Sequence, residues 1–142
     1  MPLSSRLALA VHTLGVVADR EHRGPVASDV VASSASTNPV VVRRLYSALG
    51  KAGLLTVRPG PGGGARLRRS LDEITLLDVY QAVENGEVFT LPASPPDPDC
   101  KVGPRVQRSL AAVFERVEGA LWREMREIRV SEIVAREPIA RR

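Results

Sequence analysis

Asn38 followed by Pro39 forms the clearest helix start in this 142-residue chain. The asparagine side chain can accept a backbone N–H as an N-cap, and proline at the first helical position loses nothing, because an N–H there would be unpaired anyway. The helix is predicted to span residues 39–52 and to end before Gly53, where a left-handed backbone is needed. One face carries an apolar stripe that should pack: Val42, Leu45, Leu49 and Ala52. The opposite face is predicted to be presented outward: Val40, Arg43, Arg44, Ser47 and Lys51.

The segments around this helix follow a recognisable order. Two helices are predicted before it, over residues 4–20 and about 28–33, from apolar spacing and from Ser28 as a helix start. Two short strands, 54–58 and 65–69, follow it and enclose a turn of glycines and prolines at 59–64. Three helices and a Gly-rich hairpin are typical of a winged helix-turn-helix unit, whose third helix enters the major groove of DNA.

The charge distribution supports a nucleic-acid partner. Residues 1–70 carry ten Lys/Arg against three acidic residues, a net charge of +7, whereas residues 71–142 carry ten against thirteen, a net charge of −3. A basic half indicates a polyanion, whose phosphates supply affinity by releasing counterions. Four arginines bracket the glycine turn and suit a hairpin tip near the minor groove: Arg58, Arg66, Arg68 and Arg69.

The second half of the chain is predicted to contain a fourth helix, a proline-rich loop and a long C-terminal helix. Thr75 and Asp78 form a capping box that opens a fourth helix, closed by Asn85-Gly86, and the five prolines of residues 92–104 predict a loop. Beyond it a helix is predicted over 105–136, about 48 Å long at about 1.5 Å per residue. Such a helix is too long for a domain of this size to cover, so its apolar stripe predicts a homodimer interface. The stripe comprises Val106, Leu110, Val113, Val117, Leu121, Met125 and Ile128.

The predicted fold is therefore mainly α with a small β-hairpin wing. Residues 1–86 form the winged helix-turn-helix domain, 87–104 a proline-rich connecting loop, 105–136 the dimerisation helix and 137–142 a tail. We expect a cytoplasmic protein with no membrane partner, because no apolar stretch approaches the ~18 residues of a span and no signal peptide is evident. Two histidines, one cysteine and no clustered acid pair argue against an enzyme.

At this point the residues resemble a known family. The run Asn38-Pro39-Val40-Val41-Val42-Arg43-Arg44-Leu45, then Ala52-Gly53-Leu54 and Gly60-Pro61-Gly62-Gly63-Gly64, is similar to the winged-helix region of the Rrf2 family of bacterial transcription regulators. One departure is Ala65, where many members have an aromatic residue. The resemblance implies a homodimer that binds a roughly palindromic operator on double-stranded DNA and usually represses transcription.

The resemblance also points to DNA-contacting residues by position. On the recognition helix and its start they are Thr37, Asn38, Pro39, Val40, Arg43, Arg44 and Ser47. The wing contributes Gly62, Gly63 and Arg66, to which its charge adds Arg58. Near the starts of the first two helices, Ser5, Arg6 and Ser28 are candidate phosphate contacts.

Some members of the family hold an iron–sulfur cluster with three cysteines in the loop before the long helix. Cys100 is the only cysteine here, so three-cysteine ligation is excluded. A mixed site would at most join Cys100 to His12 of a second copy, and Ala8 stands where such a site needs a carboxylate. We therefore expect no cofactor.

Two questions stay open at the level of the sequence. Cys100 is either an oxidisable thiol, half of an intersubunit disulfide, or inert. The chain as a whole is either a sequence-specific DNA-binding regulator or a winged-helix interaction module that has lost specific DNA binding. The salt dependence of binding separates these last two hypotheses.

Overall fold

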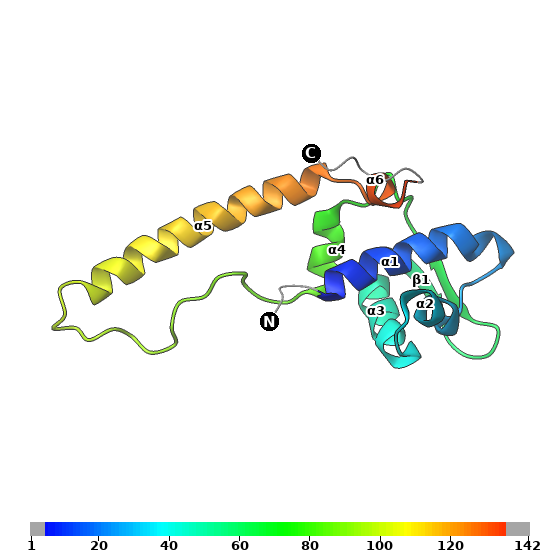
Figure 1. Ribbon diagram of the computed structural model, residues 1–142, viewed down its shortest axis with the longest axis horizontal. Helices are drawn as coiled ribbons and strands as arrows, with labels where there is room; N and C mark the ends of the chain where they lie inside the picture. Colours follow the sequence, from blue (N-terminus) through cyan, green and yellow to red (C-terminus); the bar gives the residue numbers. More distant parts are fainter. Residues whose placement is uncertain (1–4, 136–142) are drawn as a thin grey trace.

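The structure, a computed structural model, describes residues 5–135. Four helices and a hairpin form an N-terminal unit, from which one long helix extends as an arm (Figure 1). The elements in chain order are α1 (Ser5–Arg20), the 3-10 turn η1 (Glu21–Arg23), α2 (Ser28–Ala35), α3 (Pro39–Lys51), β1 (Leu55–Arg58), β2 (Gly64–Leu67), α4 (Leu76–Val83), α5 (Gly103–Glu127) and α6 (Val130–Val134). None of the helices in this described range is both long and apolar enough to cross a bilayer.

Helix α3 begins as predicted and ends one residue earlier. The Asn38 side chain accepts a hydrogen bond from the Val40 N–H at 2.8 Å, and Gly53 has a φ of +77°. Three members of the predicted stripe are buried: Val42, Leu45 and Leu49. Ala52 is exposed, because it lies past the last helical residue, so its assignment to the stripe was wrong. Tyr46 is buried instead, and its hydroxyl donates to the Val26 carbonyl at 2.7 Å.

The hairpin is joined to the helices by backbone hydrogen bonds. β1 and β2 are antiparallel, with Leu55 opposite Leu67, and Val26 pairs with buried Ala65 through two bonds of 2.9 Å. Gly64 has a φ of +149°, and a Cβ there would overlap the Val26 carbonyl. Close internal packing of the backbone therefore requires glycine at this position.

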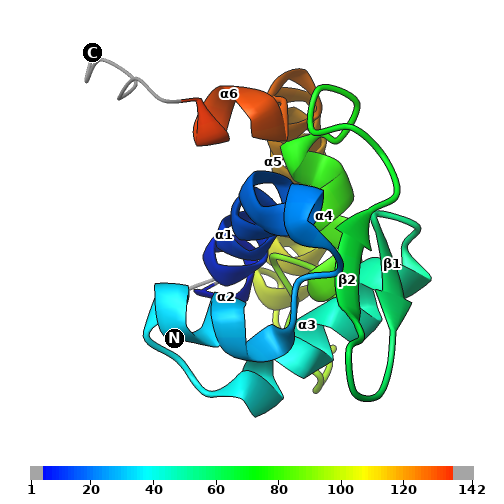
Figure 2. The same ribbon diagram turned by 90° about the vertical axis from the view of Figure 1, so that its right-hand side faces the viewer.

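The core of the N-terminal unit lies between α1 and the other helices. α1 contacts α2, α3 and α4, and Leu14 and Val17 on it are fully buried. The predicted capping box is confirmed: the Thr75 hydroxyl accepts from the Asp78 N–H, and the Asp78 carboxylate accepts from the Thr75 N–H. In the end-on view the hairpin stands beside α3 and α4, and α6 lies over α1 (Figure 2).

The long helix is shorter than predicted. α5 ends at Glu127, Ile128 and Arg129 are extended, and α6 follows, so a single helix over 105–136 was wrong. The break has a tertiary cause: the Ile128 carbonyl accepts from Leu76 N, and Val130 N donates to the Ile74 carbonyl, both at 2.9 Å. These bonds replace helical ones and dock the chain on the start of α4. Residue 136 and the predicted tail 137–142 lie outside the described residues.

Residues 84–102 contain neither helix nor strand, and α5 begins at Gly103, two residues before the end predicted for the connecting loop. The loop follows α5 out to its far end (Figure 1). Its start is fixed to that helix, because the Glu118 carboxylate accepts from Val88 N and Phe89 N at 3.0 and 3.1 Å. The Phe89 ring stacks on Phe114 with centroids 5.2 Å apart.

Candidate nucleic-acid interface

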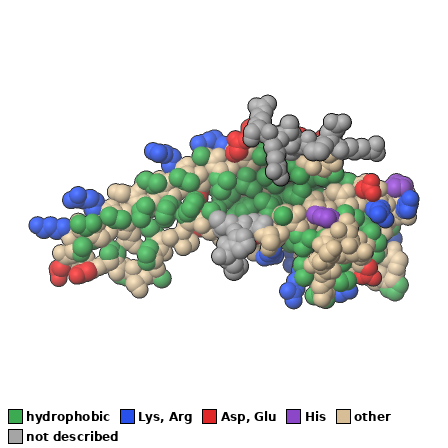
Figure 3. Space-filling view, in the orientation of Figure 1, with side chains coloured by type: hydrophobic (Ala, Val, Ile, Leu, Met, Phe, Trp, Pro, Cys, Tyr) green, Lys and Arg blue, Asp and Glu red, His purple; other side chains and the backbone are tan. Residues whose placement is uncertain are grey.

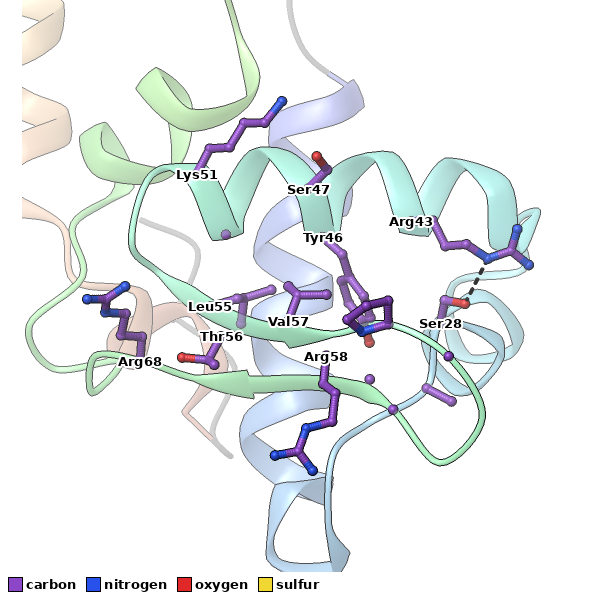
Figure 4. Close-up of a pocket in the computed structure, with 16 residues that line it drawn as sticks. Ser28, Arg43, Tyr46, Ser47, Lys51, Leu55, Thr56, Val57, Arg58 and Arg68 are labelled. Atoms are coloured by element: carbon purple, nitrogen blue, oxygen red, sulfur yellow. Dashed lines mark hydrogen bonds between the residues drawn. The ribbon is translucent and has the colours of Figure 1, made fainter.

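A groove of about 760 Å³ lies between α3, the start of α2 and the hairpin (Figure 4). Four cationic side chains line it, and no acidic residue is among the described residues of its wall. The cations are Arg43 and Lys51 from α3, Arg58 from β1 and Arg68 after β2. A concave wall with one sign of charge concentrates the potential that attracts phosphates.

The predicted outward face of α3 is exposed in full: Val40, Arg43, Arg44, Ser47 and Lys51. Figure 4 shows Tyr46 pointing from α3 toward the hairpin, while Ser47 and Lys51 leave the helix on its outer side. The Arg43 Nε donates to the Ser28 Oγ at 3.3 Å, which brings two predicted contacts together. Arg44 has no hydrogen bond or ion pair to any residue in the range 5–135 and is free to bind a ligand.

The remaining predicted contacts of the helices lie at helix starts. Thr37 and Asn38 precede α3, and Pro39 is its first residue. Ser5 and Arg6 are at the exposed start of α1, and neither lines the groove. The structure thus brings Ser28, Arg43 and Ser47 to one site and leaves Ser5 and Arg6 apart from it.

Of the predicted wing residues, too, some line the groove and others do not. Arg58 and Gly63 line the groove, and Gly62 is exposed at the hairpin tip. Arg66 does not line it, because its Nη1 donates to the carbonyl of Glu21 in η1 at 3.1 Å. The neighbouring Leu67 N–H donates to the Glu21 carboxylate at 2.8 Å.

Two of the four cationic groove residues, Lys51 and Arg68, were absent from the predicted contacts. Lys51 is on the outward face that helical spacing already predicted, so that spacing was a usable signal. Arg68 was recognised only as one of the charges around the turn. Its N–H donates to the Leu54 carbonyl at 3.1 Å, one residue beyond the paired strands. This extension of the ladder past β2 carries Arg68 back alongside the groove.

The apolar stripe of α5 is exposed along most of its length. Val106, Leu110, Val113, Val117 and Leu121 are between 37% and 46% exposed, and Figure 3 shows a band of apolar side chains along this arm. The last two predicted interface residues differ. Met125 is only 6% exposed within the single chain, and Ile128 is half-buried where its carbonyl binds the start of α4. Both are therefore packed within their own chain.

Cys100 is exposed just before α5. Its Sγ accepts a hydrogen bond from Gly103 N at 3.4 Å. Backbone hydrogen bonds from Gly103 and Val102 lower the pKa of the thiol, because they stabilise the thiolate. His12 lies on α1 with its Nε2 2.9 Å from the Ser34 Oγ, beside a hollow of about 510 Å³ between α1 and α6.

These donors do not fit an iron–sulfur cluster held by one chain. The sequence has a single cysteine, and no three His, Cys, Asp or Glu side chains within residues 5–135 are grouped closely enough to hold a metal ion. Clusters of this kind depend on several thiolate ligands.

Comparison with known proteins agrees with the winged-helix arrangement. The Rrf2 family model, described as an iron-dependent transcriptional regulator, matches residues 3–136. Bacillus subtilis YwnA, whose name describes an HTH-type transcriptional regulator, is 41% identical over 123 residues, which cover 87% of this chain and 90% of YwnA.

Solved structures share the fold. A crystal structure described as a candidate DNA-binding protein has a TM-score of 0.71 at 37% identity, covering 91% of this chain and 98% of its own. IscR of T. potens has a TM-score of 0.67 at 19% identity, covering 94% and 86% of the two chains. The family match over nearly the whole chain, together with the exposed helix and basic groove, shows that this protein belongs to the Rrf2 family of DNA-binding transcriptional regulators, which are not enzymes.

Proposed function

We propose that this protein is a homodimeric repressor that binds a palindromic operator, with α3 in the major groove and the hairpin near the minor groove. The observation that carries the proposal is the face of α3, which exposes Arg43, Arg44 and Ser47 while its other side is buried in the core. In helix-turn-helix proteins the N-terminal part of the recognition helix contacts base edges. An arginine there can bind guanine with two hydrogen bonds or clamp phosphates.

The hairpin supports a second set of contacts. Arg58 and Arg68 extend the positive charge of the groove from α3 onto the wing. Arginine side chains suit the narrow minor groove, where the negative potential is strong. A duplex held by α3 in its major groove would place the adjacent backbone against these two residues.

The homodimer is supported by the exposed stripe of α5. Contiguous apolar surface of this kind marks protein interfaces, and a two-fold axis would cover the same stripe on both copies. Two copies related by that axis present two α3 helices, which matches a palindromic site. The repressor assignment follows from the family resemblance.

Replacing Arg43 and Arg44 together with alanine tests the DNA mechanism. The DNA just upstream of the coding region, with excess nonspecific competitor, is the first target. We expect affinity to fall roughly a hundredfold, since each arginine contact contributes about 1–3 kcal/mol, and the salt slope to decrease by about two. Arg116→Ala with Arg123→Ala, two exposed arginines of α5, is the matched control and should bind normally.

Unchanged affinity in the Arg43/Arg44 variant would contradict the proposed recognition helix. Binding to DNA that is weak, erased by competitor and indifferent to Arg43 and Arg44 would instead favour the interaction-module hypothesis. An apolar protein interface would also lack the steep salt dependence of phosphate contacts.

We also propose a thiol-based redox response at Cys100, in a protein without a resident cluster. The exposed thiol, with its lowered pKa, can accept an oxygen atom from a peroxide, which gives a sulfenate and leaves water. Cys100 lies three residues before the first residue of α5, so its oxidation would act at the start of the proposed dimer helix. Peroxide should change operator binding in the wild type and leave Cys100→Ser unchanged; identical responses would contradict the proposal.

A further inference from the structure

A valine, Val40, lies on the midline of the proposed DNA-facing side of α3, near the start of the helix. With 100° of rotation per residue, Val40, Ser47 and Lys51 fall in one narrow strip, and Arg43 and Arg44 lie on its two flanks. Val40 is 45% exposed and the neighbouring Val41 is also exposed. A single exposed valine is ordinary on a protein surface. This one lies in the first turn of the helix, the part of a recognition helix that meets base edges.

The backbone holds the Val40 side chain in a defined place. The Val40 N–H donates to the Asn38 side chain at 2.8 Å, and the Val41 N–H donates to the Asn38 carbonyl at 3.0 Å. Pro39, the residue before Val40, restricts the backbone of the first turn through its fixed φ angle. Because a β-branched side chain in a helix strongly prefers one χ1 rotamer, the isopropyl group is ordered before any ligand binds.

The major groove offers one apolar group on base edges, the C5-methyl group of thymine. A valine there has no hydrogen bond to offer, whereas the flanking arginines suit guanine and phosphate. We propose that Val40, assisted by Val41, reads the C5-methyl groups of thymines in each operator half-site. This inference rests on the proposed function, since it requires α3 to enter the major groove.

Deletion of single methyl groups from the DNA tests the inference. The operator is first obtained by selection from random DNA with the full-length protein. Each thymine of a half-site is then replaced by deoxyuridine, which removes only the C5-methyl group and keeps base pairing. We expect one or two positions at which wild-type affinity falls about fourfold, as for one buried methylene-sized group.

The protein side of the contact gives the matching experiment. Val40→Ala should bind the thymine operator about fourfold more weakly and should no longer distinguish deoxyuridine from thymine at the sensitive position. Val40→Thr keeps the branched shape and one methyl group, so its affinity for the thymine operator should lie between those of the wild type and Val40→Ala. Val30→Ala, at a similarly exposed valine of α2, is the control and should keep the wild-type deoxyuridine profile.

The outcomes separate this inference from the function on which it rests. If the protein selects a specific operator and no deoxyuridine position matters, or if Val40→Ala keeps the wild-type profile, thymine reading by Val40 is overturned and the repressor proposal stands. If no specific DNA is selected, the proposed function itself fails, and this inference fails with it.

Discussion

The N-terminal unit, residues 5–83, and α5 carry similar apolar stripes, yet only the first is covered by its own chain. Of the twenty buried apolar residues within 5–135, eighteen lie in the N-terminal unit, whereas Met125 is the only buried residue of the 25-residue α5. Leu49 of α3 is fully buried, and Leu110 of α5 is 37% exposed. The same helical spacing therefore leads to opposite environments.

The difference lies in what the chain places next to each helix. Short connections return α2 and β1 directly against α3, and both contact it. The segment before α5 is a loop without helix or strand, which covers only the flank of the helix at Glu118 and Phe114. An amphipathic pattern thus predicts that a face will be buried, while the neighbouring elements decide whether the same chain can bury it.

The largest effect expected from this comparison is on stability. Leu49→Ala leaves a cavity in the core and should lower the free energy of unfolding by about 2–5 kcal/mol at any protein concentration, measured by urea denaturation. Leu110→Ala removes the same atoms from the α5 stripe. Its effect should be smaller and should depend on protein concentration. Equal, concentration-independent losses would show that α5 is covered within its own chain.

A charge in the stripe should separate the proposed dimer without unfolding its subunits. Val113→Asp places a carboxylate in the interface of both copies, and the cost of burying it should raise the dissociation constant roughly a hundredfold or more. Ala112→Asp introduces the same charge on the exposed polar side of α5 and is the matched control. Sedimentation should find Val113→Asp monomeric and Ala112→Asp dimeric; a Val113→Asp dimer would place the interface elsewhere.

The parts of the fold that could be predicted from the sequence have local causes. The start of α3 depends on Asn38 and Pro39, and the start of α4 depends on Thr75 and Asp78. The two residues of each pair lie within three positions of each other in the sequence. The break after Glu127 could not be predicted, because the apolar spacing continues through Ile128 without glycine or proline. Its cause is a backbone pairing with Ile74 and Leu76, more than fifty positions away in the chain.

The same distinction holds in the candidate site: residues placed by local spacing were predicted, and residues placed by contacts between distant segments were not. Arg43, Arg44 and Ser47 were predicted because helical spacing alone places them on one face. The orientation of Arg66 was not, since it depends on the carbonyl of Glu21, which the fold brings alongside β2. Tyr46 was missed for the same reason: its acceptor, the Val26 carbonyl, belongs to the connection between α1 and α2.

The smallest expected effect concerns the hydrogen bond from Tyr46 of α3 to the Val26 carbonyl, which also pairs with Ala65 of the hairpin. Tyr46→Phe removes only the hydroxyl, and the Val26 carbonyl keeps its bond from Ala65 N, so unfolding at neutral pH should cost about 1 kcal/mol less. Burial raises the pKa of Tyr46 from 10.0 to about 12. Between these pH values the unfolded chain releases a proton that the folded protein keeps, so the wild type should lose about 1 kcal/mol of stability from pH 10 to 11. Tyr46→Phe lacks this loss, and urea midpoints that fall in parallel for both proteins would place the Tyr46 hydroxyl in water.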